Sequence, residues 1–209
     1  MNLDEKIISA LKDLDYKEAT EIQKKAIPIA LKKRDILAAA QSGTGKTAAF
    51  LLPILTELIA NKQPNKPVLR TLILVPTREL ASQISKAAED LGKYLDVQKL
   101  AVFGGVSTKE QEKKIAKGLD ILVATSGRLM EHLKNGTVDL SSVTTVVIDE
   151  VDTMLDMGFL EDIEKILPSV GPKRQIMMFS ATMNQNVKKL AKEFLTDPVV
   201  IEVAQQRSA

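Results

Sequence analysis

The chain has 209 residues, of which 44% are hydrophobic and 27% charged, a balance typical of one large globular domain. It contains no cysteine, which excludes disulfides, thiolate metal ligands and cysteine nucleophiles, and its single histidine, His132, cannot form a histidine-based metal site. The formal net charge of +2 and the aromatic content of 3% argue against a surface that stacks the bases of single-stranded nucleic acid.

Nothing in the sequence points to export or to a membrane. Charged residues are spread through positions 1–20, and no apolar run reaches the roughly 18 residues that a membrane span needs. We therefore expect a cytoplasmic protein with no secretory signal and no membrane contact. His132 falls in a predicted helix, and we expect it to serve on the surface or in packing.

Helical periodicity alternates with short apolar runs along the chain. The apolar runs predict strands at Asp35–Ala39, Thr71–Val75, Val97–Val102, Asp120–Ala124, Val143–Ile148, Gln175–Phe179 and Val199–Val203. Helices are predicted at Leu3–Leu14, Thr20–Lys33, Lys46–Ala60, 78–94, 107–118, 126–135, 159–168 and 184–195. Four apolar residues share one face of the second helix: Ile22, Ala26, Ile27 and Ala30. This alternation predicts one α/β domain over residues 1–203, with a doubly wound, mostly parallel sheet covered by helices on both faces. A short polar tail follows at 204–209.

A glycine-rich segment joins the first predicted strand to the helix that begins at Lys46: Ala40-Gln41-Ser42-Gly43-Thr44-Gly45-Lys46-Thr47. Glycines let backbone N–H groups approach phosphate oxygens, and the helix start adds the positive end of its dipole. Lys46 is then placed to neutralise phosphate charge, and the Thr47 hydroxyl to complete a Mg²⁺ shell. The general pattern has glycine where Ala40 stands. The alternative interpretation is a strand-to-helix turn with an incidental lysine.

Three carboxylates follow the predicted strand Val143–Ile148: Asp149, Glu150 and Asp152. They fall at the carboxyl edge of the sheet, where open α/β folds bind ligands. Because like charges repel, their closeness indicates a cation, and we predict that Asp149 holds Mg²⁺ beside the phosphate loop. Glu150 is then placed to position or deprotonate an attacking water. The alternative is a solvated turn at a helix start, where carboxylates are favoured.

Seven short motifs, in order and at plausible spacing, resemble the first RecA-like domain of the DEAD-box ATP-dependent RNA helicases. The motifs are Thr20–Gln23, Ala40–Thr47, Pro76–Ala81, Gly104-Gly105, Thr125–Arg128, Asp149–Asp152 and Ser180–Thr182. In this family alanine is usual where Ala40 stands. The departures are Val151 for alanine, which gives an Asp-Glu-Val-Asp form of motif II, and Ser126 and Ala19 for proline. We expect Val151 to pack into local apolar space without displacing Asp149 or Asp152.

The resemblance implies how the nucleotide is bound. Residues 1–33 hold the Q-motif region, in which the Gln23 amide would read the N6/N7 edge of adenine and select ATP over GTP. The phosphates would lie on Gln41, Ser42, Gly43, Thr44, Gly45, Lys46 and Thr47, with Mg²⁺ between Thr47 and Asp149. The family also stacks an aromatic residue on adenine, and that position falls at about Met1, so the contact is expected to be missing. Outside the family, Gln23 would be interpreted as a surface glutamine on an amphipathic helix.

The resemblance also implies a binding surface for one RNA strand. Thr77, Arg78, Gly105, Thr125 and Arg128 each follow a predicted strand, and their hydroxyl, guanidinium and N–H groups suit phosphate contacts that carry no sequence information. Contacts to 2′-hydroxyl groups would select RNA over DNA. The alternative interpretation of Arg78 and Arg128 is that they are ordinary residues at helix starts.

In the family, Asp152 does not bind the metal. It bonds instead to the Ser-Ala-Thr motif, here Ser180 and Thr182, and so links the nucleotide state to domain closure. The alternative is that Ser180 and Thr182 cap the helix predicted to begin near Asn184. The catalytic residues implied by the resemblance are Lys46, Asp149, Glu150, Asp152, Ser180 and Thr182.

The family's second RecA-like domain carries an arginine finger and half of the RNA groove, and nothing in residues 1–209 matches its His-Arg-x-Gly-Arg signature. We therefore expect this chain to be a monomeric fragment that binds ATP weakly and hydrolyses it slowly. The whole protein is expected to unwind RNA locally at the expense of ATP. An ATP-dependent RNA clamp is the alternative, and an ATPase that acts on protein or DNA is disfavoured by Gln23 and Thr125–Arg128.

Overall fold

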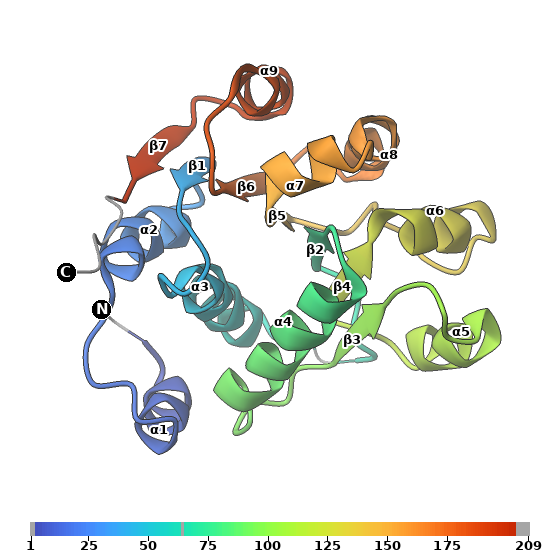
Figure 1. Ribbon diagram of the computed structural model, residues 1–209. Helices are drawn as coiled ribbons and strands as arrows, with labels where there is room; N and C mark the ends of the chain where they lie inside the picture. The colour runs from blue at the N-terminus through green and yellow to red at the C-terminus, as the bar shows by residue number, and fades with distance from the viewer. Residues whose placement is uncertain (1–2, 64, 204–209) are drawn as a thin grey trace.

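The computed structural model describes residues 3–63 and 65–203 of the chain (Figure 1). The predicted tail at 204–209 lies outside the described residues, as does position 1, at which the adenine-stacking aromatic is expected. In the described ranges, no helix combines the length and the apolar character that a membrane crossing requires.

One sheet of seven strands forms the centre of the structure, in the order β3-β4-β2-β5-β6-β1-β7. The strands are β1 (Ile36–Ala39), β2 (Thr71–Val75), β3 (Lys99–Val102), β4 (Ile121–Thr125), β5 (Thr145–Ile148), β6 (Gln175–Ser180) and β7 (Val199–Glu202). Every neighbouring pair is parallel. The predicted strands are thus all confirmed, with ends displaced by one or two residues, and so is the parallel sheet.

The helices lie where the periodicity predicts them, with one addition. They are α1 (Glu5–Asp13), α2 (Glu21–Leu31), α3 (Lys46–Ala60), α4 (Arg78–Leu91), α5 (Thr108–Ala116), α6 (Ser126–Lys134), α7 (Val151–Asp156), α8 (Leu160–Ile166) and α9 (Gln185–Phe194). The α7 helix was not among the predicted helices, because six residues of mixed character carry no readable period. The helix predicted at 159–168 ends earlier, at Ile166, since Pro168 enters a 3₁₀ turn, η1 (Leu167–Ser169).

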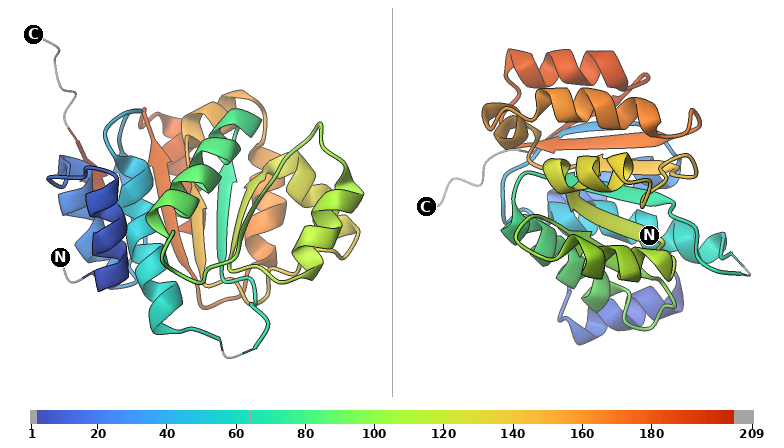
Figure 2. Two further views of the ribbon diagram at one scale, coloured as in Figure 1. Left: turned by 90° about the horizontal axis from the view of Figure 1, so that it is seen from below. Right: turned by 90° about the vertical axis from the view of Figure 1, so that its right-hand side faces the viewer.

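Two apolar layers separate the sheet from its helices (Figure 2). One layer joins α1, α2, α3 and α4 to one face of the sheet, and it contains the four residues predicted to share a face of α2, all of them buried. The other layer joins α6, α7, α8 and α9 to the opposite face. Helices on both faces explain why the strands are continuous apolar runs and not alternating ones.

The strand order decides which chain segments meet at the carboxyl edge of the sheet. Because β6 lies between β1 and β5, the segments after these three strands are neighbours: the glycine-rich loop, the Ser-Ala-Thr motif and the carboxylates. The segments after β2, β4 and β3 form the other half of the same edge. The edge therefore has a β1–β6–β5 half and a β2–β4–β3 half, each carrying one set of the predicted site residues.

Candidate nucleotide site and nucleic-acid surface

The glycine-rich loop is folded as a tight turn that leads into α3. Gly43 and Gly45 have positive φ angles of 81° and 88°, which glycine adopts without strain. A Cβ atom on Gly45 would lie 2.6 Å from Nε2 of Gln23 and 2.7 Å from the Thr20 hydroxyl, so no other residue fits there. The Thr44 hydroxyl donates to the carbonyl oxygen of Gln41 at 2.7 Å, which closes the loop on itself. Gln41, Ser42 and Gly43 are exposed.

Gln23 lies beneath this loop and is only 3% exposed, so its interpretation as a surface glutamine is wrong. Its Oε1 accepts from the Thr20 N–H at 3.0 Å, which completes a capping box at the start of α2. Its Nε2 donates to the carbonyl oxygen of Gly45 at 3.0 Å. The Gln23 amide therefore ties α2 to the loop, while its contact with adenine stays a prediction.

Lys46 and Asp149 form a buried ion pair, with 2.8 Å between Nζ and Oδ1. Asp149 is completely buried, and its Oδ1 also accepts from the Glu150 N–H at 2.9 Å. Its Oδ2 is buried and has no hydrogen-bond partner in the described part of the chain. Burial raises the pKa of the Asp149 carboxyl, while Lys46 opposes this shift. The pair thus leaves one carboxylate oxygen without a hydrogen-bond partner among the described residues, although that oxygen is enclosed.

Glu150 is held in a rare backbone conformation, with φ of 53°, at the N-cap of α7. Its carboxylate is 4.0 Å from Nζ of Lys46, and its side chain is 28% exposed. Burial raises the pKa of Glu150, Lys46 opposes the shift, and the nearby Asp149 and Asp152 reinforce it. A carboxylate of raised basicity that reaches solvent is suited to accept a proton from water.

Asp152 is directed away from Lys46 and towards β6. Its Oδ2 accepts from both the backbone N–H and the hydroxyl of Thr182, each at 3.0 Å, and its own N–H donates to the Ser180 hydroxyl at 3.3 Å. Burial favours the protonated form, but bonds from Thr153, Thr182 and Ser180 outweigh it and lower the pKa of Asp152. These are the contacts that the resemblance implies.

The alternative role of the Ser-Ala-Thr motif, as the cap of α9, is wrong. The α9 helix is capped by Asn184, whose side chain accepts from the Val187 N–H at 3.0 Å. Between the carboxylates, Val151 is fully buried in the apolar layer under α7. It therefore packs as predicted, and the Asp152 contacts are made beside it.

On the other half of the edge, Arg78 and Gly105 lie together. The Arg78 guanidinium is 5.2 Å from the centre of the Phe103 ring, and its Nη1 is 3.1 Å from where a Cβ of Gly105 would be. Arg78 is exposed, and Gly105 is exposed with φ of 81°. The Thr77 hydroxyl accepts from the Leu80 N–H at 3.2 Å and so caps α4. Thr125 takes the same N-cap position on α6, without a side-chain bond.

Arg128 differs from Arg78, because its side chain is only 11% exposed and its guanidinium is occupied. Nη1 donates to the carbonyl oxygen of Val106 at 2.8 Å and to Oε1 of Gln111 at 2.9 Å. Nε lies 3.0 Å from a carboxylate oxygen of Glu131. The structure therefore places Arg128 behind the loop that carries Gly105, and a direct phosphate contact by this side chain is not what the geometry shows.

Comparison with known proteins places this arrangement in a family. A family model described as DEAD/DEAH box helicase matches residues 20–190. The chain belongs to the DEAD/DEAH box helicase family. It is 43% identical over 204 residues to the DEAD-box ATP-dependent RNA helicase RhpA of Helicobacter pylori, covering 98% of this chain and 40% of RhpA. It is 39% identical over 202 residues to the helicase CshA of Bacillus subtilis, covering 97% of this chain and 40% of CshA.

Solved structures agree with the sequence relatives. A DEAD box protein from Methanococcus jannaschii has a TM-score of 0.91 at 35% identity, covering 98% of this chain and 55% of that one. A hypothetical ATP-dependent RNA helicase from Sulfolobus tokodaii has a TM-score of 0.87 at 39% identity, covering 97% and 57%. The predicted RecA-like α/β fold is therefore confirmed. The chain spans about 40% of the length of RhpA and CshA.

Some residues of this DEAD/DEAH box domain were missed by sequence reasoning. Gln111, which is 4% exposed, donates through Nε2 to the carbonyl oxygen of Phe103 at 3.1 Å. Ser126, at the position where the family has proline, is buried, and its hydroxyl donates to Asp162 of α8 at 2.8 Å. The sequence could have offered only one signal for either residue, a polar side chain at a position of a predicted helix that its period turns towards the sheet. His132 is completely buried beside Gln111, so packing and not the surface is its location.

The residues of this helicase-family site offer Mg²⁺ separate oxygen donors and not a complete protein cage. No group of three or more histidine, cysteine, aspartate or glutamate side chains in the described ranges forms a metal cage. Mg²⁺ seldom needs such a cage, because it keeps several waters and takes one or two carboxylates together with substrate phosphates. The partnerless Oδ2 of Asp149 and the Thr47 hydroxyl are oxygen donors of the right kind.

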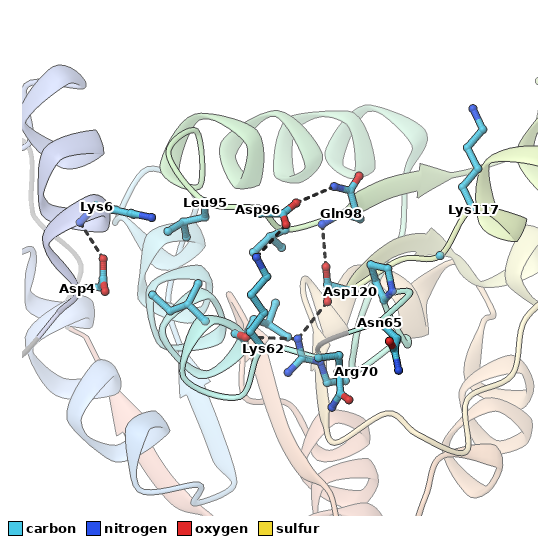
Figure 3. Close-up of a pocket in the computed structure, with 16 residues that line it drawn as sticks. Asp4, Lys6, Lys62, Asn65, Arg70, Leu95, Asp96, Gln98, Lys117 and Asp120 are labelled. Carbon is cyan, nitrogen blue, oxygen red and sulfur yellow. Dashed lines mark hydrogen bonds and ion pairs between the residues drawn. The ribbon is translucent and has the colours of Figure 1, made fainter.

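A cavity of about 630 Å³ lies at the opposite edge of the helicase-family sheet (Figure 3). It opens at the amino ends of β2, β3 and β4, where Arg70 pairs with Asp120 at 3.0 Å and Asp120 accepts from the Gln98 N–H at 2.8 Å. Lys62 pairs with Asp96 at 2.9 Å. The charges that line this cavity are largely paired with one another, and none of the predicted site residues lies in it.

Proposed function

We propose that this chain is the ATP-binding domain of an ATP-dependent RNA helicase, which couples ATP binding and hydrolysis to local unwinding of RNA duplexes. Two observations support the proposal together: family membership, and relatives named as ATP-dependent RNA helicases. The observation that carries it within the structure is the Lys46–Asp149 pair beneath a glycine-rich loop, with Oδ2 of Asp149 left without a partner.

ATP and Mg²⁺ would share this half of the edge. The N–H groups of residues 41–45 would face the phosphates, and Gln23 would turn its remaining hydrogen-bonding capacity to adenine. Lys46 would exchange its bond with Asp149 for the phosphates, which frees that carboxylate to hold Mg²⁺, through water, together with Thr47. The metal would supply charge neutralisation at the phosphates.

Hydrolysis would depend on Glu150. Its side chain is partly exposed beside Lys46, and its raised pKa favours proton acceptance. Asp152 would couple the nucleotide state of this site to β6 and the segment after it, because its carboxylate accepts from Thr182 and its N–H donates to Ser180. In this proposal the Ser-Ala-Thr motif transmits the nucleotide state to the interface with a second RecA-like domain.

RNA would lie on the other half of the edge. Arg78 and Gly105 are exposed and adjacent, and Thr77 and Thr125 stand at the starts of α4 and α6, where N–H groups favour phosphate oxygens. Contacts of this kind hold a backbone without reading its sequence. We propose RNA in place of DNA on the names of the relatives.

A second RecA-like domain in the parent protein would complete the catalytic site. Residues 1–203 would form the first domain, and 204–209 would begin the linker or a tail. Because an arginine finger contributes about 10³–10⁵-fold to phosphoryl transfer, residues 1–209 alone should hydrolyse ATP very slowly. We propose that the isolated domain is a monomer and that the parent protein is cytoplasmic.

The decisive experiment compares RNA-stimulated ATP turnover in the parent two-domain protein and its Glu150→Gln variant. We expect turnover to fall about 100-fold or more while Mg-ATP affinity stays within about threefold, because the change removes only the proton acceptor. Glu164→Gln, an exposed carboxylate on α8, is the matched control and should have wild-type turnover.

Three results would contradict the proposal. Stimulation by DNA but not by RNA would exclude the RNA helicase assignment. ATP-dependent RNA binding by the parent protein without any duplex unwinding would favour the clamp, in which holding and not unwinding is the task. Rapid RNA-stimulated hydrolysis by residues 1–209 alone would exclude the need for a second domain.

A further inference from the structure

A buried polar cluster lies behind the loop that joins β3 to α5. Its members are Gln111 on α5 and Arg128 and His132 on α6, with exposed fractions of 4%, 11% and 0%. The loop in front of them carries Gly104 and Gly105, which are both exposed. The cluster and the loop therefore form an inner and an outer layer of the same surface.

The cluster holds the backbone on both sides of the two glycines. Gln111 donates through Nε2 to the carbonyl oxygen of Phe103 at 3.1 Å. Arg128 donates through Nη1 to the carbonyl oxygen of Val106 at 2.8 Å. A third bond, from the same Nη1 to Oε1 of Gln111 at 2.9 Å, joins the two donors into one unit.

The direction of every bond in the cluster is fixed by chemistry. A guanidinium only donates and a carbonyl oxygen only accepts, so the Gln111 amide must turn Oε1 to Arg128 and Nε2 to Phe103. His132 Nε2 lies 2.9 Å from the same Oε1, and it must therefore carry the proton of the ring. Because no second arrangement of the cluster satisfies these groups, the two loop carbonyls are held in one place.

The loop needs such support, because glycine backbones are unusually free. Gly105 has a positive φ of 81°, and a Cβ there would be 3.1 Å from the Arg78 guanidinium. Two adjacent glycines in an exposed loop would otherwise populate many conformations, and a binding partner would have to order them. The Phe103 carbonyl shares its peptide plane with the Gly104 N–H, so fixing it also fixes where that N–H is directed. Fixing the Val106 carbonyl holds the chain just after Gly105, so the two glycines are anchored from both sides.

We propose that Gln111 is a positioning residue for RNA binding. It acts with Arg128 to hold the Gly104-Gly105 backbone in the conformation that meets an RNA phosphate, while the exposed Arg78 makes the direct contact. The proposal rests on the proposed function, because it deepens the RNA site on the β2–β4–β3 half of the edge. It assigns Arg128 an indirect role in RNA binding, and it gives a reason why the polar Gln111 is buried.

The test uses two variants of Gln111 that differ in what they keep. Gln111→Met preserves length and removes all three bonds of the side chain, whereas Gln111→Glu keeps an acceptor for Arg128 and His132 and replaces the donor to Phe103 by an acceptor. Gln83→Met, an exposed position on α4, is the matched control. For each protein we would measure the affinity for a short single-stranded oligouridylate by fluorescence anisotropy, the affinity for Mg-ATP, and the amide resonances of Gly104 and Gly105.

For Gln111→Met we expect RNA affinity to fall about tenfold, with altered Gly104 and Gly105 resonances and Mg-ATP affinity within about twofold of wild type. For Gln111→Glu we expect about a threefold loss of RNA affinity, since two of the three bonds remain and only the one to Phe103 is lost. If Gln111→Met fails to unfold cooperatively, Gln111→Glu decides the question by itself. Gln83→Met should match the wild type in every measurement.

The two levels of the proposal fail differently. All of these variants are tested in the parent two-domain protein, and absence of RNA binding by its wild-type form would overturn the proposed function, and the positioning role with it. RNA binding by wild type with equal affinity in both Gln111 variants would overturn the positioning role alone. A parallel loss of RNA and Mg-ATP affinity would also overturn it, because a fault confined to this loop cannot weaken the other half of the edge.

Discussion

The two edges of the sheet each hold a buried pair between a cation and an aspartate. The pairs differ in whether the second carboxylate oxygen of the aspartate has a hydrogen-bond partner. At the amino edge, Arg70 lies 3.0 Å from Oδ1 of Asp120, and Oδ2 of that aspartate accepts from the Gln98 N–H at 2.8 Å. At the carboxyl edge, Lys46 lies 2.8 Å from Oδ1 of Asp149, and Oδ2 has no partner in the described residues. A carboxylate bonded through both oxygens serves the fold, and one with a free oxygen is available for a ligand.

The cations of the two pairs also differ, in the number of partners that hold each of them. The Arg70 guanidinium also donates to the carbonyl oxygens of Asn61 at 2.6 Å and Leu58 at 3.3 Å, at the end of α3, so it is fixed at several points. Lys46 has Asp149 as its close partner and Glu150 at 4.0 Å. An ammonium on a flexible stem can move from a carboxylate to a phosphate, whereas a guanidinium bonded to three partners cannot do so without disrupting the fold.

The largest expected effect comes from breaking the pair at the amino edge. Asp120→Ala leaves Arg70 buried without its counterion and the Gln98 N–H without an acceptor. We expect the free energy of unfolding to fall by about 3 kcal/mol, as for other buried pairs that lose one partner. Urea unfolding measures this change, and Mg-ATP affinity of the folded variant should stay unchanged.

Asp96→Ala is the matched control for that variant. Asp96 pairs with Lys62 at the mouth of the same cavity, but both side chains are more than 60% exposed, and such pairs contribute little. We expect almost no change in stability. If Asp120→Ala proved as stable as Asp96→Ala, the amino-edge pair would not be structural, and the contrast between the two edges would be wrong.

A smaller effect, and one on ligand binding, is expected at the carboxyl edge. Asp149→Asn removes the charge that would hold Mg²⁺ but keeps an oxygen facing Lys46. We expect Mg-ATP affinity to fall about tenfold, or about 1.4 kcal/mol. The loss of free energy of unfolding should be smaller than for Asp120→Ala, because the asparagine oxygen still accepts from Lys46 and the Glu150 carboxylate remains 4.0 Å from its Nζ. Isothermal titration calorimetry and urea unfolding measure the two quantities.

Repeating the calorimetric titration with a chelator separates the contribution of Mg²⁺ to ATP affinity from that of the glycine-rich loop. Without divalent metal, Asp149→Asn should bind ATP at least as tightly as wild type, since the metal contact is then absent from both and Lys46 leaves a neutral amide more easily than a carboxylate. Asp156→Asn, an exposed position at the end of α7, should match the wild type with and without metal. A tenfold difference that persists in the chelator would show that Asp149 acts through Lys46 and not through Mg²⁺.

The sequence predicts well whatever depends on a period or on an uninterrupted motif. The five inner strands are apolar runs buried on both faces, so their places follow directly. Asp152 makes the contacts with Ser180 and Thr182 that the resemblance implies. Parallel strands also bring the ends of their runs to one edge, which explains why the site residues meet. The α7 helix was missed, since its six residues are too few to show a helical period.

The sequence does not show which polar side chains are already hydrogen-bonded within the fold. Arg78 and Arg128 both follow strands, yet one is exposed over Phe103 and the other is bonded to Val106 and Gln111. The difference arises from how the β3–α5 loop folds back over α6, and no local pattern encodes that path. In the same way, Gln23 was predicted at the nucleotide site, but its bonds to Thr20 and Gly45 required the structure.

The smallest expected effect, on stability, comes from His132. This residue tests whether a buried polar atom without a hydrogen-bond partner always indicates a ligand site. Its Nδ1, like Oδ2 of Asp149, is buried without a partner in the described residues, but it is enclosed among Gln111, Arg128 and the packing of α5 and α6. Burial and the Arg128 charge lower the pKa of His132, against weaker opposition from Glu112 and Glu131. The imidazole is therefore held neutral in the folded state.

The consequence is a loss of stability in acid. Because the folded pKa lies below the ordinary 6.5, the unfolded chain takes up a proton first as the pH falls through that value. The full contribution is present above about pH 6.5, and we expect the free energy of unfolding to be lower near pH 5.5 than near pH 7. His132→Gln, which keeps an N–H donor for Gln111, should lack this component. Urea unfolding across this range decides the matter: parallel curves for the two proteins would show that the fold does not lower the pKa of His132, which would contradict an imidazole held neutral by burial and Arg128.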